Sequence, residues 1–304
     1  MTVVGMAAFL LVGAVAVRAG SWLPTPAGAA LPAGSSGELA AAAVSPPPPP
    51  PRVPALPRGK GMWLHRLEWA AGGDPAALVA HAKAVGLTHV YLRLGSSKRG
   101  FYAQGDLDRL LPVAHAGDLS VVGWDFPYFF DPRADAERAA AEIAYTTPDG
   151  HRIDAFSADV ETRFEGVNLT NDGAAAYGAR LRELVGPGYP LIATIPPPPR
   201  AAYPFDQVTG HFDAIAPMVY WMNRDPVSDV VRALDHLAPY GKPILPIGQA
   251  YDGGPEGGPP GPPSRDQLDR FMQAATGKGA TGFSFWVWHT ATAEHWAAIA
   301  GARL

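Results

Sequence analysis

From Lys60 to Gly301, short apolar runs alternate with amphipathic segments, and this alternation constrains the fold more than any other feature of the chain. The apolar runs are bounded by Gly, Pro or Asp and have the length of strands. We expect strands over residues 61–67, 89–95, 120–129, 154–161, 190–196, 213–221, 242–251 and 281–290. Helical spacing and capping residues predict helices over residues 74–86, 106–117, 132–145, 171–186, 203–210, 226–241, 264–277 and 291–301.

Eight such repeats in roughly 240 residues are typical of a (β/α)8 TIM barrel. An open, doubly wound parallel sheet is the main alternative, because it shows the same alternation. It rarely needs eight repeats, and its phosphate-binding pattern G-x-G-x-x-G follows none of the expected strands. We therefore predict an α/β fold with a (β/α)8 barrel over residues 59–304.

Two segments of different composition precede the predicted barrel. Residues 1–20 contain an uncharged apolar run, Val3 to Val17, of signal-peptide length, without the usual basic residues before it. Residues 21–58 are rich in Pro, Ala and Gly and include six consecutive prolines, which predicts a disordered or extended linker. We expect a signal peptide or membrane anchor, then a stalk, and hence an extracytoplasmic protein, either secreted or anchored, whose N-terminal segment contacts the membrane. A buried helix is the alternative interpretation of the first segment.

Charge and composition exclude several classes of function. The formal net charge is -4, and no basic block beyond "SSKRG" (96–100) is present, so we expect no nucleic-acid partner. Cysteine is absent, which excludes disulfides, Cys-based zinc sites and thiol nucleophiles. The first expected strand has no H-x-H pair, which disfavours a metal-dependent barrel hydrolase. We expect no metal, no cofactor and a monomer.

Two acids end the fourth expected strand, in "DAFSADVE". Alternate residues of a strand share a face, with Ala155, Ser157, Asp159 and Glu161 on one and Phe156, Ala158 and Val160 on the other. The apolar set suits the layer under the helices, so the acids are expected inside the barrel, at the end where barrel enzymes carry their active sites. The alternative is a structural ion pair with an inward basic group such as Arg93.

The same alternation brings further polar and aromatic residues to that end. We expect a ligand to be contacted by Trp63, His65, Asp125, Tyr220, Trp221, Tyr251 and Trp286. Asp125 is included because it shares a face with Val121 and Gly123. Trp124 and Trp296 are expected in the core instead. Paired carboxylates among aromatic rings suit a sugar, because aromatic faces stack on pyranose C–H surfaces and carboxylates act on glycosidic oxygens.

At these residues the chain resembles glycoside hydrolase family 18, the chitinase-like barrels. The family's fourth strand carries D-x-x-D-x-D-x-E, and Asp154, Asp159 and Glu161 match it, with Ser157 at the inner Asp. "MVYW" matches its sixth-strand M-x-Y-D at Met218 and Tyr220 but has Trp221 where the family has Asp. The eighth strand has Gly282 followed four residues later by Trp286, as in the family.

The resemblance also has departures and a competitor. The family's third-strand S-x-G-G is absent. Family 25 lysozymes carry D-x-E on an equivalent strand, but their first-strand Asp is missing where Trp63, Leu64 and His65 stand.

The family 18 resemblance implies a role for each matching residue. Glu161 would be the general acid that protonates the leaving oxygen, while Asp159 orients the substrate's 2-acetamido group. Tyr220 would bind the acetamido oxygen, and Trp286 would form the floor under that sugar. We therefore expect a glycosidase that cleaves an N-acetylhexosamine-containing polysaccharide or oligosaccharide, peptidoglycan or chitin-like. Two alternatives remain open: a non-catalytic carbohydrate-binding barrel at the cell surface, and a scaffold that binds no glycan.

Overall fold

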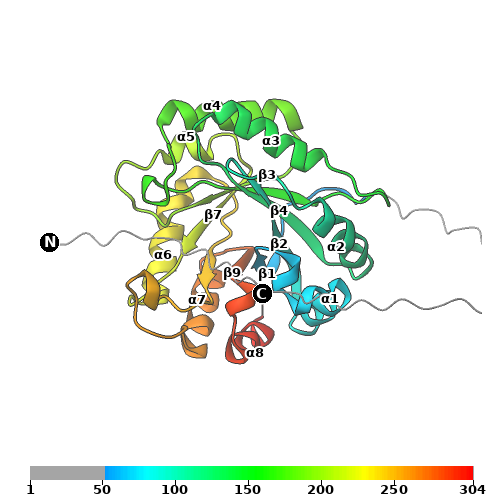
Figure 1. Cartoon of the computed structure of the whole chain (residues 1–304). Coiled ribbons are helices and arrows are strands. Elements are labelled where there is room, and N and C mark those ends of the chain that lie inside the picture. The colour runs from blue at the N-terminus through cyan, green and yellow to red at the C-terminus, as the bar shows by residue number, and fades with distance from the viewer. Residues whose placement is uncertain (1–51, 304) are drawn as a thin grey trace, which may run out of the picture. The chain divides into compact units, whose positions relative to one another are not determined.

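The structure, a computed structural model, describes residues 52–303 and contains a closed barrel of parallel strands (Figure 1). Within these residues the sheet order is β1-β9-β8-β7-β6-β5-β4-β2-β3, and pairing of β1 with β2 closes it. The strands are β1 (Gly59–Leu64), β2 (Leu87–Ser96), β3 (Gly100–Phe101), β4 (Ser120–Phe126), β5 (Ala155–Asp159), β6 (Leu191–Ile195), β7 (Ala214–Val219), β8 (Ile247–Gln249) and β9 (Gly282–Trp286). The predicted (β/α)8 TIM barrel is confirmed.

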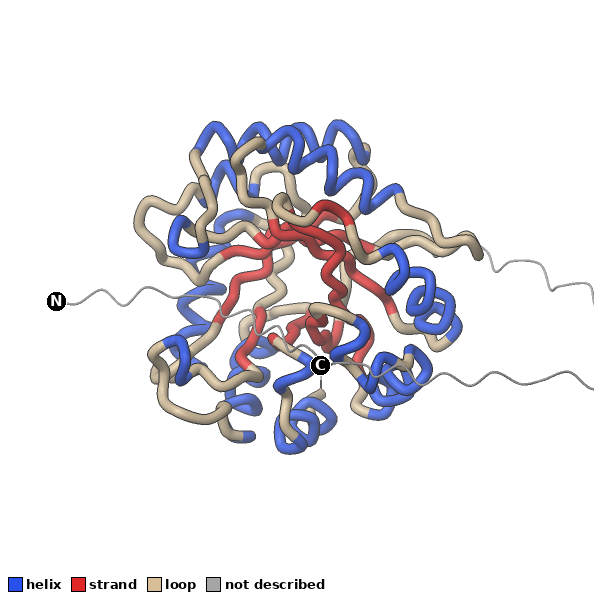
Figure 2. Tube along the Cα trace, in the orientation of Figure 1, coloured by secondary structure: helices blue, strands red, loops and turns tan. Residues whose placement is uncertain are grey.

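Helices surround the strands, as the blue and red tubes of Figure 2 show. They are α1 (Pro75–Ala84), α2 (Gln104–Ala116), α3 (Pro132–Ala144), α4 (Asn171–Val185), α5 (Phe205–Thr209), α6 (Pro226–Leu237), α7 (Arg265–Gly277) and α8 (Ala293–Gly301). Local chemistry sets where they begin. Three helices, α1, α3 and α6, begin with an aspartate followed by a proline. The side chain of the aspartate accepts a hydrogen bond from a backbone N–H of the first turn, at Asp74, Asp131 and Asp225. Such a cap, with proline at the first helical position, favours helix initiation.

Two strands differ in extent from the prediction. β8 covers only Ile247–Gln249 of the expected 242–251, since Pro243 and Pro246 lack the N–H that a ladder needs. β5 ends at Asp159, so Glu161 lies in the following loop. The two-residue β3, antiparallel to β2, was not expected.

Buried side chains form two layers. One, here called the interior cluster, draws residues from every barrel strand or the loop beside it, which places it inside the barrel: Trp63, Tyr91, Val122, Trp124, Ala155, Ile192, Ala214, Ala216, Met218, Leu245, Ile247 and Val287. The other, the outer core, lies between strands and helices and includes Val121, Phe156, Val219 and Phe285. Membership of one layer or the other shows which way each strand residue faces.

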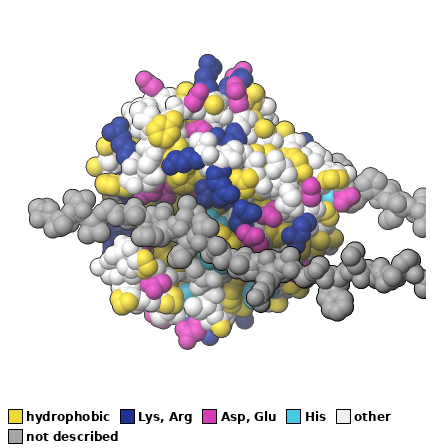
Figure 3. All heavy atoms as spheres, in the orientation of Figure 1, with side chains coloured by type: hydrophobic (Ala, Val, Ile, Leu, Met, Phe, Trp, Pro, Cys, Tyr) yellow, Lys and Arg dark blue, Asp and Glu magenta, His cyan; other side chains and the backbone are white. Residues whose placement is uncertain are grey.

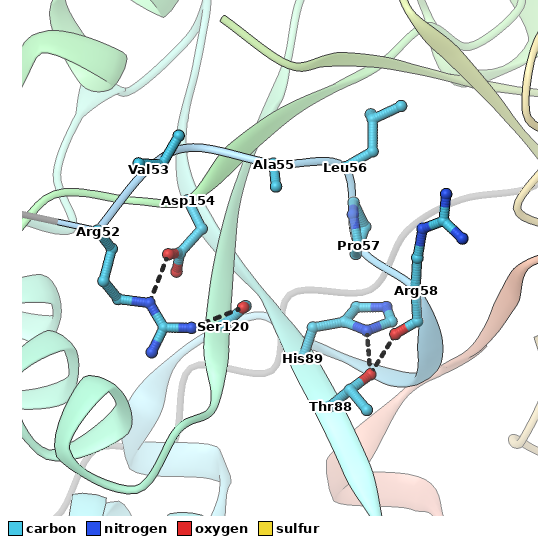
Figure 4. Close-up of a pocket in the computed structure, with 10 residues that line it drawn as sticks. All are labelled: Arg52, Val53, Ala55, Leu56, Pro57, Arg58, Thr88, His89, Ser120 and Asp154. Atoms are coloured by element: carbon cyan, nitrogen blue, oxygen red, sulfur yellow. Dashed lines mark hydrogen bonds and ion pairs between the residues drawn. The ribbon is translucent and has the colours of Figure 1, made fainter.

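Residues 52–58 cross the end of the barrel where the strands begin (Figure 4). Arg52 points at Asp154, with 3.1 Å between Nε and Oδ1, and the two residues line a cavity of about 130 Å³. Asp154 Oδ2 also accepts from the Val121 N–H at 2.8 Å. Asp154 therefore has a structural role at the start of β5, at the end of the barrel opposite to the one that carries Asp159 and Glu161. The rest of the predicted linker, and the predicted signal or anchor, lie outside the described residues.

The surface of the described part has no dominant charge on the face shown in Figure 3, where acidic and basic side chains are interspersed. Among residues 52–303, no helix is both long enough and apolar enough to span a membrane.

Candidate active site

The acids of β5 lie at the end of the barrel where the strands finish, here called the mouth. Ala155 belongs to the interior cluster, whereas Phe156 and Ala158 belong to the outer core, so Asp159 faces inward. Asp159 is 6% exposed, and its Oδ1 atom has no hydrogen-bond partner among the described residues. Glu161 follows in the loop and is half-buried. The structure thus places one buried and one partly accessible carboxyl group at the mouth.

Both carboxyl groups have raised pKa values. Burial raises the pKa of Asp159 to about 7, with a smaller contribution from the negative charge of Glu165 and opposition from Arg93. Burial also raises the pKa of Glu161 well above its ordinary value, and the charges of Asp159 and Glu165 add to this effect. The structural alternative of an Arg93 ion pair is not observed: within residues 52–303 neither acid forms a salt bridge, and the Arg93 guanidinium lies 4.8 Å from the centre of the Trp124 ring. A carboxyl group with a raised pKa keeps its proton to higher pH, which suits an acid that donates a proton to a leaving group.

Two tyrosines lie beside the acids. Tyr220, at the end of β7, packs on the interior cluster and meets Tyr251 edge-on, with ring centroids 5.5 Å apart. Burial raises the pKa of Tyr220 well above its ordinary value, and the charges of Asp159 and Glu161 contribute. Tyr251 is largely buried, and its hydroxyl donates to Glu256 Oε2 at 2.7 Å. Tyr220 is thus the better placed of the two to offer its hydroxyl to a ligand.

Aromatic rings form the opposite side of the mouth. The half-buried Trp286 lies 4.8 Å from His65 and 5.8 Å from Trp63 between ring centroids. Trp63 is only 1% exposed, stacks on Tyr91 at 4.1 Å and donates from its indole N–H to Ser284 Oγ. It therefore supports Trp286 from within the barrel and is not itself exposed to a ligand. Burial lowers the pKa of His65 to about 3, so its imidazole is neutral at physiological pH.

Trp221 does not belong to the mouth, and the expectation that it contacts a ligand is wrong. It is 0% exposed, belongs to the outer core and packs on Phe271 of α7, with ring centroids 5.4 Å apart. It directly follows Tyr220, which faces inward, and consecutive residues of an extended chain point to opposite sides.

The prediction that Asp125 faces the barrel interior is also wrong, because its side chain points to the helix layer. Its carboxylate accepts two hydrogen bonds from Arg138 of α3, at 2.6 and 3.2 Å, and it is 0% exposed. Its neighbour Trp124 belongs to the interior cluster, so the inward face of β4 is the opposite of the expected one.

Two residues that sequence reasoning left out of the site lie at the mouth. Trp124, expected in the core, lies 5.5 Å from Trp286 and 5.6 Å from His65 between ring centroids, and its indole N–H donates to the Leu64 carbonyl. Arg93 lies over its face. Val122 and Trp124 share one face of β4, which could have indicated that Trp124 faces inward. The other face also carries an apolar residue, Val121, so the sequence did not decide between the two faces. In the described part of the chain, no group of three His, Asp or Glu residues is arranged to hold a metal ion.

Comparison with known proteins supports the fold assignment. No protein-family model and no curated protein sequence matches the chain. Among solved structures, the GH18 chitinase ChiB of Flavobacterium johnsoniae has a TM-score of 0.59 at 12% identity, over 80% of this chain and 93% of that one. The spore cortex-lytic enzyme SleL of Bacillus cereus has a TM-score of 0.58 at 12% identity, over 80% and 73%. The endo-1,4-beta-mannanase of Rhizomucor miehei has 0.55 at 10% identity, over 76% and 86%.

The chain therefore shares the (β/α)8 barrel fold of these solved structures. At such low identities the similarity concerns the fold, and the chemistry must be argued from this chain's own residues.

One departure from the family 18 pattern has a clear structural context. Ser157 lies inside the barrel, one inward position before Asp159, and its hydroxyl is 2.8 Å from Thr194 Oγ1 of β6. Both side chains are buried. Where the family motif has a second carboxylate next to this Asp, the chain has a pair of hydrogen-bonded hydroxyls.

Proposed function

We propose that this protein is an extracytoplasmic glycoside hydrolase that cleaves N-acetylhexosamine-containing glycans of the peptidoglycan or chitin type. The observation that carries the proposal is the acid pair Asp159 and Glu161. It lies at the mouth of a glycosidase-like barrel, forms no salt bridge with a described residue, and has raised pKa values. Such a pair can supply an acid near neutral pH.

In the proposed mechanism, the Glu161 carboxyl group donates its proton to the glycosidic oxygen as the bond to the anomeric carbon breaks. The substrate's own acetamido oxygen attacks that carbon, and Asp159 with the Tyr220 hydroxyl orients the acetamido group. Glu161, now ionised, accepts a proton from the water that completes hydrolysis. Trp286 supports the sugar ring, because aromatic faces pack well on apolar C–H surfaces.

The full chain should therefore release reducing ends from defined oligomers of N-acetylglucosamine or from peptidoglycan fragments, detected by mass analysis of the products. Replacing Glu161 by Gln should lower turnover by about 10²- to 10⁴-fold, the usual contribution of general acid catalysis. The Glu183→Gln variant, on the exposed face of α4, is a matched control and should keep wild-type turnover. Wild-type turnover in Glu161→Gln would remove Glu161 from the acid role.

A non-catalytic carbohydrate-binding barrel is the second candidate. The hydroxyl pair of Ser157 and Thr194 favours it, because a neutral pair beside Asp159 lacks the proton relay of a second carboxylate. The burial of Trp221 in the outer core removes the extra aromatic surface that would have favoured it. Glycan binding that is unaffected by Glu161→Gln, with no product released by the wild-type chain, would establish the binding role.

A further inference from the structure

A second cavity lies beside the acid pair on the same end of the barrel. It has a volume of about 450 Å³ and is formed by the loop after β5, the loop after β6 and the start of α4. Its lining includes Thr162, Arg163, Phe164, Asn171, Arg200 and Tyr203. Thr162 is the residue that follows Glu161, so the cavity begins where the candidate acid ends.

Two guanidinium groups give this cavity its charge. Within residues 52–303, neither Arg163 nor Arg200 forms a salt bridge or donates a side-chain hydrogen bond. Glu165, two residues after Arg163, is hydrogen-bonded elsewhere, because its Oε2 atom accepts from the N–H and the hydroxyl of Thr162. The first turn of α4 adds the positive end of a helix dipole at Asn171. The lining of the cavity thus contains two guanidinium groups and no carboxylate, while Glu165 and Asp172 of the neighbouring segments lie outside it.

An aromatic surface accompanies the charge. Phe164 is 77% exposed, and the Arg200 guanidinium lies 5.8 Å from the centre of its ring. The exposed phenyl ring can pack on the apolar face of a sugar. The two arginine side chains beside it can bind an anionic substituent of that sugar. Arginine is well suited to the second role, because its planar fork matches a carboxylate.

We propose that this cavity is a binding subsite for a carboxylate-bearing sugar unit of the glycan, next to the unit held at Asp159 and Glu161. This inference rests on the proposed function and names a feature of its substrate. Phe164 stacks on the sugar ring, while Arg163 and Arg200 bind the carboxylate. Arg200 also has a second effect, since its charge counteracts the rise in the pKa of Glu161. Arg163 is therefore the cleaner position for a test.

The test measures binding in a full-length Glu161→Gln background, in which turnover does not interfere. The probes are a tetrasaccharide of alternating N-acetylglucosamine and N-acetylmuramic acid, and the same compound with its lactyl carboxyl groups reduced to alcohols. A glucuronate-containing oligosaccharide distinguishes a ring carboxylate from a lactyl carboxylate. We expect the acidic probe to bind at least about tenfold more tightly than its reduced form, a difference of about 1.4 kcal/mol, and this preference should shrink in high salt.

Three further variants assign the preference to the cavity. Arg163→Gln should abolish most of it, whereas Phe164→Ala should weaken both probes to the same extent. Arg303→Gln, an exposed arginine near the chain's end, should change neither.

Equal affinity for the acidic and reduced probes, or a preference that survives Arg163→Gln, would overturn the inference. If the wild-type chain hydrolyses neutral oligomers without any such preference, the subsite fails while the proposed function stands. If the preference depends on Arg163 but the wild-type chain hydrolyses nothing, the subsite stands and the hydrolase proposal fails.

Discussion

Carboxyl groups are buried in two regions of this barrel, and the regions differ in what surrounds them. At the mouth, Asp159 and Glu161 have no salt-bridge partner among the described residues, and Glu161 is partly accessible. On the other side of the sheet, under α3, Asp125 and Glu142 are 0% exposed. Burial raises the pKa of all four groups.

Arg138 makes the difference under α3. It binds Asp125 at 2.6 Å and Asp135 at 2.6 Å, and its Nε atom is 3.9 Å from Glu142. Buried acids with raised pKa values therefore do not by themselves mark a catalytic site. Access for a ligand and the lack of a fixed counter-ion separate the mouth from the structural cluster, and three predictions test this distinction.

The largest effect is expected from removing the counter-ion under α3. The Arg138→Met variant leaves Asp125 and Asp135 buried without compensation, which should lower the free energy of unfolding by about 3–5 kcal/mol. Urea denaturation at pH 7 measures it, and turnover per folded molecule should not change. Arg180→Met, which breaks the exposed ion pairs of α4, is the control and should have a much smaller effect. A small loss in Arg138→Met would show that the cluster is not neutralised by this residue.

Replacing Glu142 should raise the free energy of unfolding, by less than the loss expected in Arg138→Met. The two carboxyl oxygens of Glu142 have no hydrogen-bond partner among the described residues. Burial, followed by the charge of Asp125, raises its pKa in the folded state, so its contribution to stability is lost as pH rises from the ordinary value through the raised one. Glu142→Gln should therefore stabilise the fold by about 1 kcal/mol or more at pH 8 and by less at pH 5. Equal effects at both pH values in urea titrations would contradict this account.

The smallest expected effect is a shift in the pH dependence of the reaction at the mouth. The charge of Glu165 raises the pKa of both Asp159 and Glu161. Glu165→Gln removes that charge, and glutamine can still complete the capping box with Thr162. The pH profile of kcat/KM should therefore move to lower pH by less than about one unit, and Arg200→Gln should move the alkaline limb upward. Unchanged profiles in both variants would mean that these acids do not control the reaction.

Sequence alone was sufficient where a strand has chemically different faces. In β5 and just after it, small and acidic residues alternate with Phe156, Ala158 and Val160, so the inward direction of Asp159 was predictable. Along β7 and the residues that follow it, the same alternation placed Tyr220 inside, and it should also have excluded Trp221, its immediate neighbour. The catalytic role of these residues remains a prediction.

The repeat pattern determined the (β/α)8 barrel because each apolar run and each amphipathic segment must bury its own surface. Tertiary structure alone decided the direction of Asp125 and Trp124 on β4, since strands of a parallel barrel are buried on both faces and their alternation carries little information. It also decided which acids meet Arg138 and which stay unpaired at the mouth. Those contacts join residues on different elements, and only the closed packing of strands and helices brings them within reach of one another.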